Sequence, residues 1–175
     1  NIINVPNINN YGQQGNGVVF DLPIALIELV FKITDVREIY LLRHFFSFLI
    51  FFTSVFFFYK IAKNRYNSHF AGILGAAFLI ASPRIFAESF YNTKDICFMS
   101  LFIISLYTAI NFLEKPNIKT AIVFAISSSL AIDVRILGIL LPALIFLIYI
   151  INILRENNFA KNRIVPLLLF LVISP

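Results

Sequence analysis

The chain contains a series of long apolar segments separated by short polar stretches, and this feature limits its possible folds more than any other. The clearest segment, IYLLRHFFSFLIFFTSVFFFY, covers residues 39–59. As a helix it would measure about 30 Å, the thickness of a bilayer's hydrocarbon core. Hydrophobic residues make up 59% of the chain and charged residues 13%, against about 45–50% and about 25% in soluble domains. These features together predict a polytopic membrane protein.

We therefore expect an all-α membrane protein, a polytopic bundle of transmembrane helices in which about six spans are visible. Residues 1–38 would form an outer loop, and residues 39–175 the bundle. Small residues four apart in the second span, Ala71/Gly75 and Gly72/Ala76, favour close helix packing. The chain begins without methionine and ends within an apolar run, so we expect a fragment truncated at both ends. The spans are predicted near residues 39–62, 68–82, 93–113, 118–133, 136–154 and 164–175.

The outer loop contains a shorter apolar segment, residues 18–32, that differs from the spans. Asp21, Glu28 and Lys32 follow one another at spacings of seven and four, so they would share one face of a helix. The segment is short for a span and carries three charges. It predicts an amphipathic helix lying in the membrane interface.

Charge and cysteine content exclude other classes. The net charge is +5, but the basic residues are scattered over short loops, so we expect no nucleic-acid partner. The single cysteine, Cys97, excludes an internal disulfide and offers no metal-ligand cluster.

The loops alternate in charge, and this predicts an orientation in the plasma (inner) membrane. Loops 60–67, 114–119 and 155–163 together hold eight Lys or Arg and two Glu, so we expect them to be cytoplasmic. Seven of the nine acidic residues fall on the other, outward side. Acidic residues contribute little to topology, so their clustering calls for another explanation.

The outward stretch SPRIFAESFYNTKDIC, residues 82–97, is the main candidate for that explanation. Asp95 lies at the start of the third predicted span, where Asn92 would be the N-cap and Asp95 the N3 residue. Asp95 then either stabilises the helix alone or also works as a carboxylate facing a cavity. Arg84 and Glu88 are four apart and would pair on an exposed turn. Lys94 is either a solvated lysine or a phosphate contact.

Arg43 and Arg135 are likewise each either outside any site or part of an anion-binding site. Arg43 lies about one turn inside the first span, where it would either reach toward the outer interface or contact an anion. Asp133 and Arg135 flank a tight outer turn and are either solvated or part of a site. Carboxylates combined with Arg and Lys in an outward pocket would suit a phosphorylated, lipid-borne substrate, because the cations would hold its phosphate.

The order of these features resembles the polytopic glycosyltransferases of the GT-C fold, in the branch of the dolichyl-phosphate-mannose protein mannosyltransferases (family 39) and their bacterial relatives. The segments that carry the resemblance are Tyr11–Gly12 before VVFDLPIALIELV, then LLRHFFSFL, AAFLIASP, FYNTKDICFMSLF and AIDVRILGILLP. They cover most of residues 11–150. FYNTKDICFMSLF is the most specific, and it places Asp95 at the family's second acidic position.

The resemblance implies a multi-pass glycosyltransferase that moves a sugar, mannose or a similar hexose, from a polyprenyl- or dolichyl-phosphate donor to an acceptor. Transfer would occur on the outer (periplasmic) face, in protein glycosylation or cell-envelope synthesis. Asp95 would be the catalytic carboxylate, and the residues that bind the lipid phosphate or sugar would be Arg43, Lys94, Arg84, Glu88, Tyr91 and Arg135. A divalent metal is compatible with this chemistry, but the sequence does not require one.

The resemblance also places the family's main acidic motif ahead of Asn1, so we expect this fragment to be inactive alone. Two alternatives remain open: a secondary transporter or lipid flippase, and a non-catalytic membrane fragment. Transporters place charges near the bilayer midplane within repeats. Here the charges lie at the outer rim and no repeat is visible, which favours the enzyme.

Overall fold

The computed structural model describes residues 18–155, with side chains to residue 151, and all regular structure in this range is helical. The predicted all-α class is therefore confirmed. Most helices begin and end within a few residues of the predicted segments, and residues 164–175 lie outside the described range. The elements in chain order are α1 (Val18–Phe31), α2 (Val36–Tyr66), α3 (His69–Ala81), α4 (Pro83–Tyr91), α5 (Asp95–Glu114), α6 (Ile118–Val134), the 3₁₀ helix η2 (Ile136–Ile139) and α7 (Leu140–Arg155).

Two of these helices are long and apolar enough to cross a bilayer: α2, with 31 residues, and α5, with 20. Helices α3 and α4 meet that test only as a pair, bent by 67° at their junction. Pro83 is the first residue of α4, where its missing N–H costs no helical hydrogen bond. Ser82 lies between the two helices as the C-cap residue of α3 and the N-cap residue of α4. The structure thus supports a membrane protein with two or three spans by length and composition, and the count of six stays a prediction.

Side-chain caps fix where several helices begin. Asp35, the N-cap residue of α2, accepts a hydrogen bond from the Arg37 N–H at 2.9 Å. Asn117 and Thr120 form a reciprocal capping box at the start of α6. Short polar loops therefore return the chain into the bundle at defined residues.

Helix α5 contributes to three apolar clusters and so forms the centre of the bundle. One cluster joins it to α6 and α7 through Phe112, Phe124 and Tyr149. Another joins it to α2, α3 and α4 around Phe51 and Ile96. The third brings α1 onto α2, α5 and α6, with Phe20, Ile24, Cys97 and Val134 buried together. Helix α1 is thus packed into the described fold through one face.

Small residues allow the closest backbone approaches. A Cβ atom on Gly72 would lie 2.7 Å from the Tyr59 ring, which confirms the predicted close packing of this segment. A Cβ atom on Gly138 would lie 2.8 Å from backbone atoms of Ala131 and Ile132. Backbone cannot move aside as a flexible side chain can, so η2 is held tightly against the end of α6.

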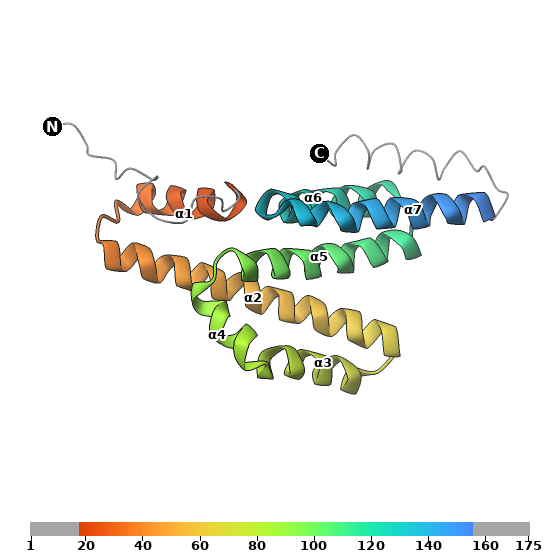
Figure 1. Cartoon of the computed structure of the whole chain (residues 1–175), viewed down its shortest axis with the longest axis horizontal. Coiled ribbons are helices and arrows are strands. Elements are labelled where there is room, and N and C mark those ends of the chain that lie inside the picture. The colour runs from red at the N-terminus through yellow and green to blue at the C-terminus, as the bar shows by residue number, and fades with distance from the viewer. Residues whose placement is uncertain (1–17, 156–175) are drawn as a thin grey trace.

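The bundle has two ends, and the loops divide between them (Figure 1). The α2–α3 and α5–α6 turns lie at the right of the view, and the α4–α5 and α6–η2 turns lie toward the left. Helix α1 runs alongside the first turns of α2 on the left. The grouping of turns matches the charge pattern of the sequence, although the side of the membrane on which each loop lies, and a location of α1 in the interface, remain predictions.

Candidate functional site

The charged residues of 84–95 converge where α4 ends and α5 begins. The nine-residue helix α4 carries Arg84 and Glu88 on one face, because residues four apart are neighbours on a helix surface. Arg84 Nε donates to Glu88 Oε1 at 3.0 Å, as predicted. The Arg84 side chain is 87% exposed, so this pair adds little stability and leaves the guanidinium accessible.

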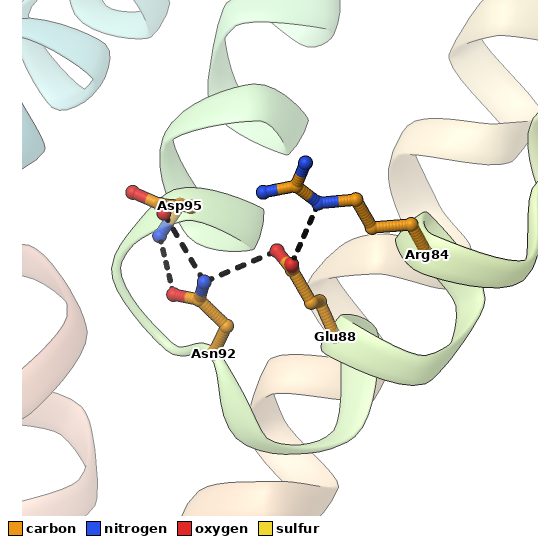
Figure 2. Close-up of polar contacts among 4 residues, drawn as sticks. All are labelled: Arg84, Glu88, Asn92 and Asp95. Carbon is orange, nitrogen blue, oxygen red and sulfur yellow. Dashed lines mark hydrogen bonds and ion pairs between the residues drawn. The ribbon is translucent and has the colours of Figure 1, made fainter.

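Asn92 connects the two carboxylates of this group (Figure 2). Its Nδ2 donates to Glu88 Oε2 at 3.2 Å and to Asp95 Oδ2 at 3.1 Å. Its Oδ1 accepts the Asp95 backbone N–H at 2.9 Å, as the predicted cap requires, but α5 begins at Asp95 itself and its N-cap position is Lys94, so Asp95 is the first helical residue and not the third. One amide therefore bonds to the first N–H of α5 and holds two acidic side chains close together.

Arg135 reaches Asp95 from the turn between α6 and η2. Its Nη2 forms an ion pair with Asp95 Oδ1, and its Cζ lies 5.9 Å from the centre of the Phe98 ring. The Arg135 side chain is 34% exposed and that of Asp95 is 48% exposed. Residues 40 positions apart are thus joined at one end of the bundle, and Arg135 is not simply a solvated turn residue.

Lys94 and Tyr91 flank the same group without taking part in its bonds. Lys94 is half-buried, and within residues 18–155 its side chain makes no hydrogen bond or ion pair. Tyr91 is 57% exposed at the end of α4. We call Arg84, Glu88, Asn92, Lys94, Asp95 and Arg135 the polar end cluster.

Arg43 belongs to a different group. Its Nη1 donates to Asp21 Oδ1 at 2.9 Å, and its Nε lies 3.9 Å from Glu28 Oε1, so both partners are acidic residues of α1. Among the described residues no hydrogen bond or ion pair connects Arg43 with Lys94. The predicted meeting of Arg43 and Lys94 on one phosphate therefore stays a prediction. In the structure, Arg43 joins α2 to α1 through these contacts with Asp21 and Glu28.

Three long-range contacts were not anticipated from the sequence: Arg43–Asp21, Arg135–Asp95 and an unusual cap on α1. In the cap, Asp133 Oδ2 accepts the Val19 N–H at 3.0 Å, so a residue from the end of α6 satisfies the start of α1. The sequence did contain a signal for these contacts, because alternating spans place these acidic and basic residues at the same end of the bundle.

The described part of the chain offers limited material for a metal site. No group of three or more His, Cys, Asp or Glu side chains lies close enough in residues 18–151 to hold a metal ion. Glu88 and Asp95 are the two carboxylates that share a hydrogen-bond donor in the polar end cluster. We therefore assign no metal ligands there.

An open groove lies elsewhere, between α2 and α3. Its volume is about 590 Å³, and its lining includes Phe52, Phe56, Tyr59, Ile73 and Ile80 but no charged residue. An anionic sugar phosphate needs cationic donors, so the polar end cluster is the better candidate for that chemistry.

Comparison with known protein families gives a match over most of the chain. The family model for dolichyl-phosphate-mannose-protein mannosyltransferase matches residues 22–175. No curated protein and no solved structure matches the chain. The matched range includes all of the polar end cluster and most of α1.

Proposed function

The chain belongs to the dolichyl-phosphate-mannose-protein mannosyltransferase family, and on that premise we propose that it is part of an integral-membrane glycosyltransferase that uses an isoprenoid-phosphate-linked sugar. The donor would be a polyprenyl- or dolichyl-phosphate sugar, with mannose or a similar hexose as the transferred group. Transfer to the acceptor would take place on the outer (periplasmic) face of the plasma membrane. The family match over residues 22–175 is the observation that carries this proposal.

The polar end cluster supports the proposal by its chemistry. Arg84, Lys94 and Arg135 are cations gathered at one end of a bundle with apolar membrane spans, and Arg and Lys are the side chains that bind phosphate. A lipid-linked donor would keep its chain among the membrane helices and present its phosphate at such an end. The cluster therefore combines membrane proximity with anion-binding groups.

The proposed reaction assigns separate roles to the cations and to Asp95. The acceptor oxygen forms a bond to the sugar's anomeric carbon, while the bond between that carbon and the phosphate oxygen breaks and its electron pair leaves with the lipid phosphate. The cations stabilise this developing charge. The Asp95 carboxylate, held at the first turn of α5 near the positive end of its dipole, stabilises positive charge on the sugar. The acceptor's proton passes to a base that we do not assign.

Substitution of Asp95 by Asn in the full-length protein tests this role. Asn keeps the shape and an acceptor oxygen but removes the charge, so we expect transfer to fall by about 10²–10³-fold. The measurement is transfer of labelled mannose from polyprenyl-phosphate mannose to acceptor by membranes that contain the variant. Asp35→Asn is the matched control: it alters an aspartate at the start of another helix, α2, and should leave transfer near normal.

Two results would contradict the proposal in different ways. Near-normal transfer by Asp95→Asn, with normal expression, would remove Asp95 from the reaction. Movement of the lipid between leaflets by the unmodified protein, without sugar transfer from any polyprenyl-phosphate donor, would favour a flippase instead.

A further inference from the structure

Both carboxylate oxygens of Asp95 are engaged in this structure. Oδ1 pairs with Arg135 and Oδ2 accepts a hydrogen bond from Asn92. A carboxylate with both oxygens engaged has reduced capacity to meet a substrate. One of the two partners must therefore move, or weaken its hold, before Asp95 can act on a sugar.

Arg135 is the partner better placed to move. Asn92 is fixed by three hydrogen bonds to Glu88 and Asp95, one of them to the backbone. Arg135 makes one ion pair in the described structure, and its long side chain is about one-third exposed. Its backbone, by contrast, is well anchored, because its N–H bonds to the Ala131 carbonyl and its carbonyl accepts the Gly138 N–H. The side chain can therefore change partner while the turn stays in place.

The surroundings of Asp95 favour an anion as the new partner. Lys94 adjoins it in sequence, its side chain makes no hydrogen bond or ion pair with the described residues, and the Arg84 guanidinium is largely exposed. A guanidinium binds phosphate through the same paired N–H groups with which it binds a carboxylate. Phosphate oxygens would thus compete with the Asp95 carboxylate for Arg135, because both acceptors suit the hydrogen-bond geometry of a guanidinium.

We propose that Arg135 is a positioning residue that restrains Asp95 before the donor binds and transfers its guanidinium to the donor phosphate when the donor arrives. Donor binding then frees Asp95 Oδ1 at the time the sugar enters. This inference rests on the proposed glycosyltransferase function, from which it takes the phosphate-bearing substrate. It adds an ordered exchange: the carboxylate becomes available only when a phosphate is present.

The exchange has a consequence that a purely structural ion pair lacks. If the phosphate must take Arg135 from Asp95, then removal of the Asp95 charge makes binding easier. A partly exposed ion pair contributes up to about 1 kcal/mol, which corresponds to about fivefold in affinity. We therefore expect Asp95→Asn to bind the lipid phosphate up to about fivefold more tightly, even though sugar transfer is lost.

The test is a double-mutant cycle on binding rather than on activity. The dissociation constant of polyprenyl phosphate is measured for the full-length protein in detergent, as wild type, Asp95→Asn, Arg135→Gln and the double variant. Arg135→Gln should weaken binding about tenfold, because one charge-assisted contact is lost. In the Arg135→Gln background, Asp95→Asn should change affinity by less than about twofold, since there is no guanidinium left to release.

Asp133→Asn is the matched control for general charge removal. It takes a negative charge from the same turn, two residues from Arg135, and keeps an oxygen for the Val19 N–H. We expect affinity within about twofold of wild type, because Asp133 does not pair with Arg135. Inorganic phosphate, tested in parallel, separates recognition of the phosphate group from recognition of the lipid chain.

Several outcomes would overturn the exchange. Equal tightening by Asp95→Asn with and without Arg135, or equal tightening by Asp133→Asn, would show a general charge effect. Unchanged affinity in Arg135→Gln would show that Arg135 never meets the phosphate. If Arg135→Gln fails to fold, Arg135→Lys replaces it in the cycle. The guanidinium exchange would then be contradicted if Arg135→Lys binds polyprenyl phosphate with wild-type affinity and Asp95→Asn still raises the affinity fully in that background. These binding results are independent of whether the protein transfers sugar, so the two proposals can fail separately.

Discussion

At the scale of single residues, Asn92 makes three hydrogen bonds within the polar end cluster. It accepts the first N–H of α5, that of Asp95, and donates to the carboxylates of Glu88 and Asp95. We expect Asn92→Ala to lower the free energy of unfolding by about 1 kcal/mol, the usual cost of losing a side-chain acceptor for an N–H at the start of a helix. The measurement is thermal or denaturant unfolding of the full-length protein in detergent.

Asn92→Ser is the comparison for that experiment. Serine retains the acceptor for the Asp95 N–H but is too short to connect Glu88 with Asp95, so it should keep most of the stability. A serine variant as unstable as the alanine variant would mean that the carboxylate contacts, rather than the bond to the Asp95 N–H, supply the stability.

The sequence predicted the contacts of the cluster that are local and missed those that are not. Asn92–Asp95 and Arg84–Glu88 are three and four residues apart, and helix geometry alone brings such pairs together. Arg135–Asp95 and Val19–Asp133 span 40 and 114 positions. They depend on how α1, α5 and α6 pack, and the sequence specifies that packing only through apolar faces compatible with several arrangements.

At the scale of elements, the attachment of α1 is the feature with the clearest consequence. Its Phe20 and Ile24 are buried in the core, while Leu22, Leu26 and Leu29 on other faces are exposed. Its acidic residues are also engaged: Asp21 bonds to Arg43, and Glu28 Oε1 is buried beside it with no hydrogen bond. Charge pairing as well as apolar packing therefore holds this helix.

Substitution of Arg43 by Gln should loosen α1. Asp21 would lose a charge-assisted hydrogen bond, at a cost of about 1.5–3 kcal/mol, and Glu28 would lose its countercharge. The measurement is the thiol-labelling rate of Ile24→Cys in a Cys97→Ala background, which should be slow when Arg43 is present and faster in the Arg43→Gln variant. Leu26→Cys, at a position already 53% exposed, is the control and should label at similar rates in both. Restoration of slow Ile24→Cys labelling by Asp21→Asn with Glu28→Gln would confirm charge pairing as the cause.

Helix positions were predicted well because apolar segments bounded by Pro, Asn and charged residues leave few choices. The exposed turn predicted for Arg84 and Glu88 is present as α4, and the predicted end of the second span near residue 82 is the α3–α4 bend. The size of the bend was not predictable. It depends on the contacts of α4 with α2, including Phe90 stacked on Phe48 at 5.0 Å, and these exist only in the folded bundle.

At the scale of the whole molecule, the two ends of the bundle differ in chemistry. The end with the α4–α5 and α6–η2 turns carries both acidic and basic residues joined in pairs. At the opposite end, the helix ends beside the α2–α3 and α5–α6 turns carry mainly Lys and Arg, including Lys63, Arg65 and Lys119. An excess of Lys and Arg marks cytoplasmic loops, and this asymmetry predicts that the polar end cluster faces outward.

Cysteine accessibility in intact cells tests that orientation. Cys97, the one cysteine of these 175 residues, is replaced by Ala, and labelling of each introduced thiol is compared with that of the Cys97→Ala background alone. Asn64 and Ala87 are both exposed, at the end of α2 and within α4. We expect a membrane-impermeant maleimide to label Ala87→Cys in intact cells, and Asn64→Cys only after permeabilisation. The reverse labelling pattern would mean that the membrane orientation is the opposite one and that the polar end cluster faces the cytoplasm. A donor presented on the outer leaflet could then not reach Arg135 or Asp95.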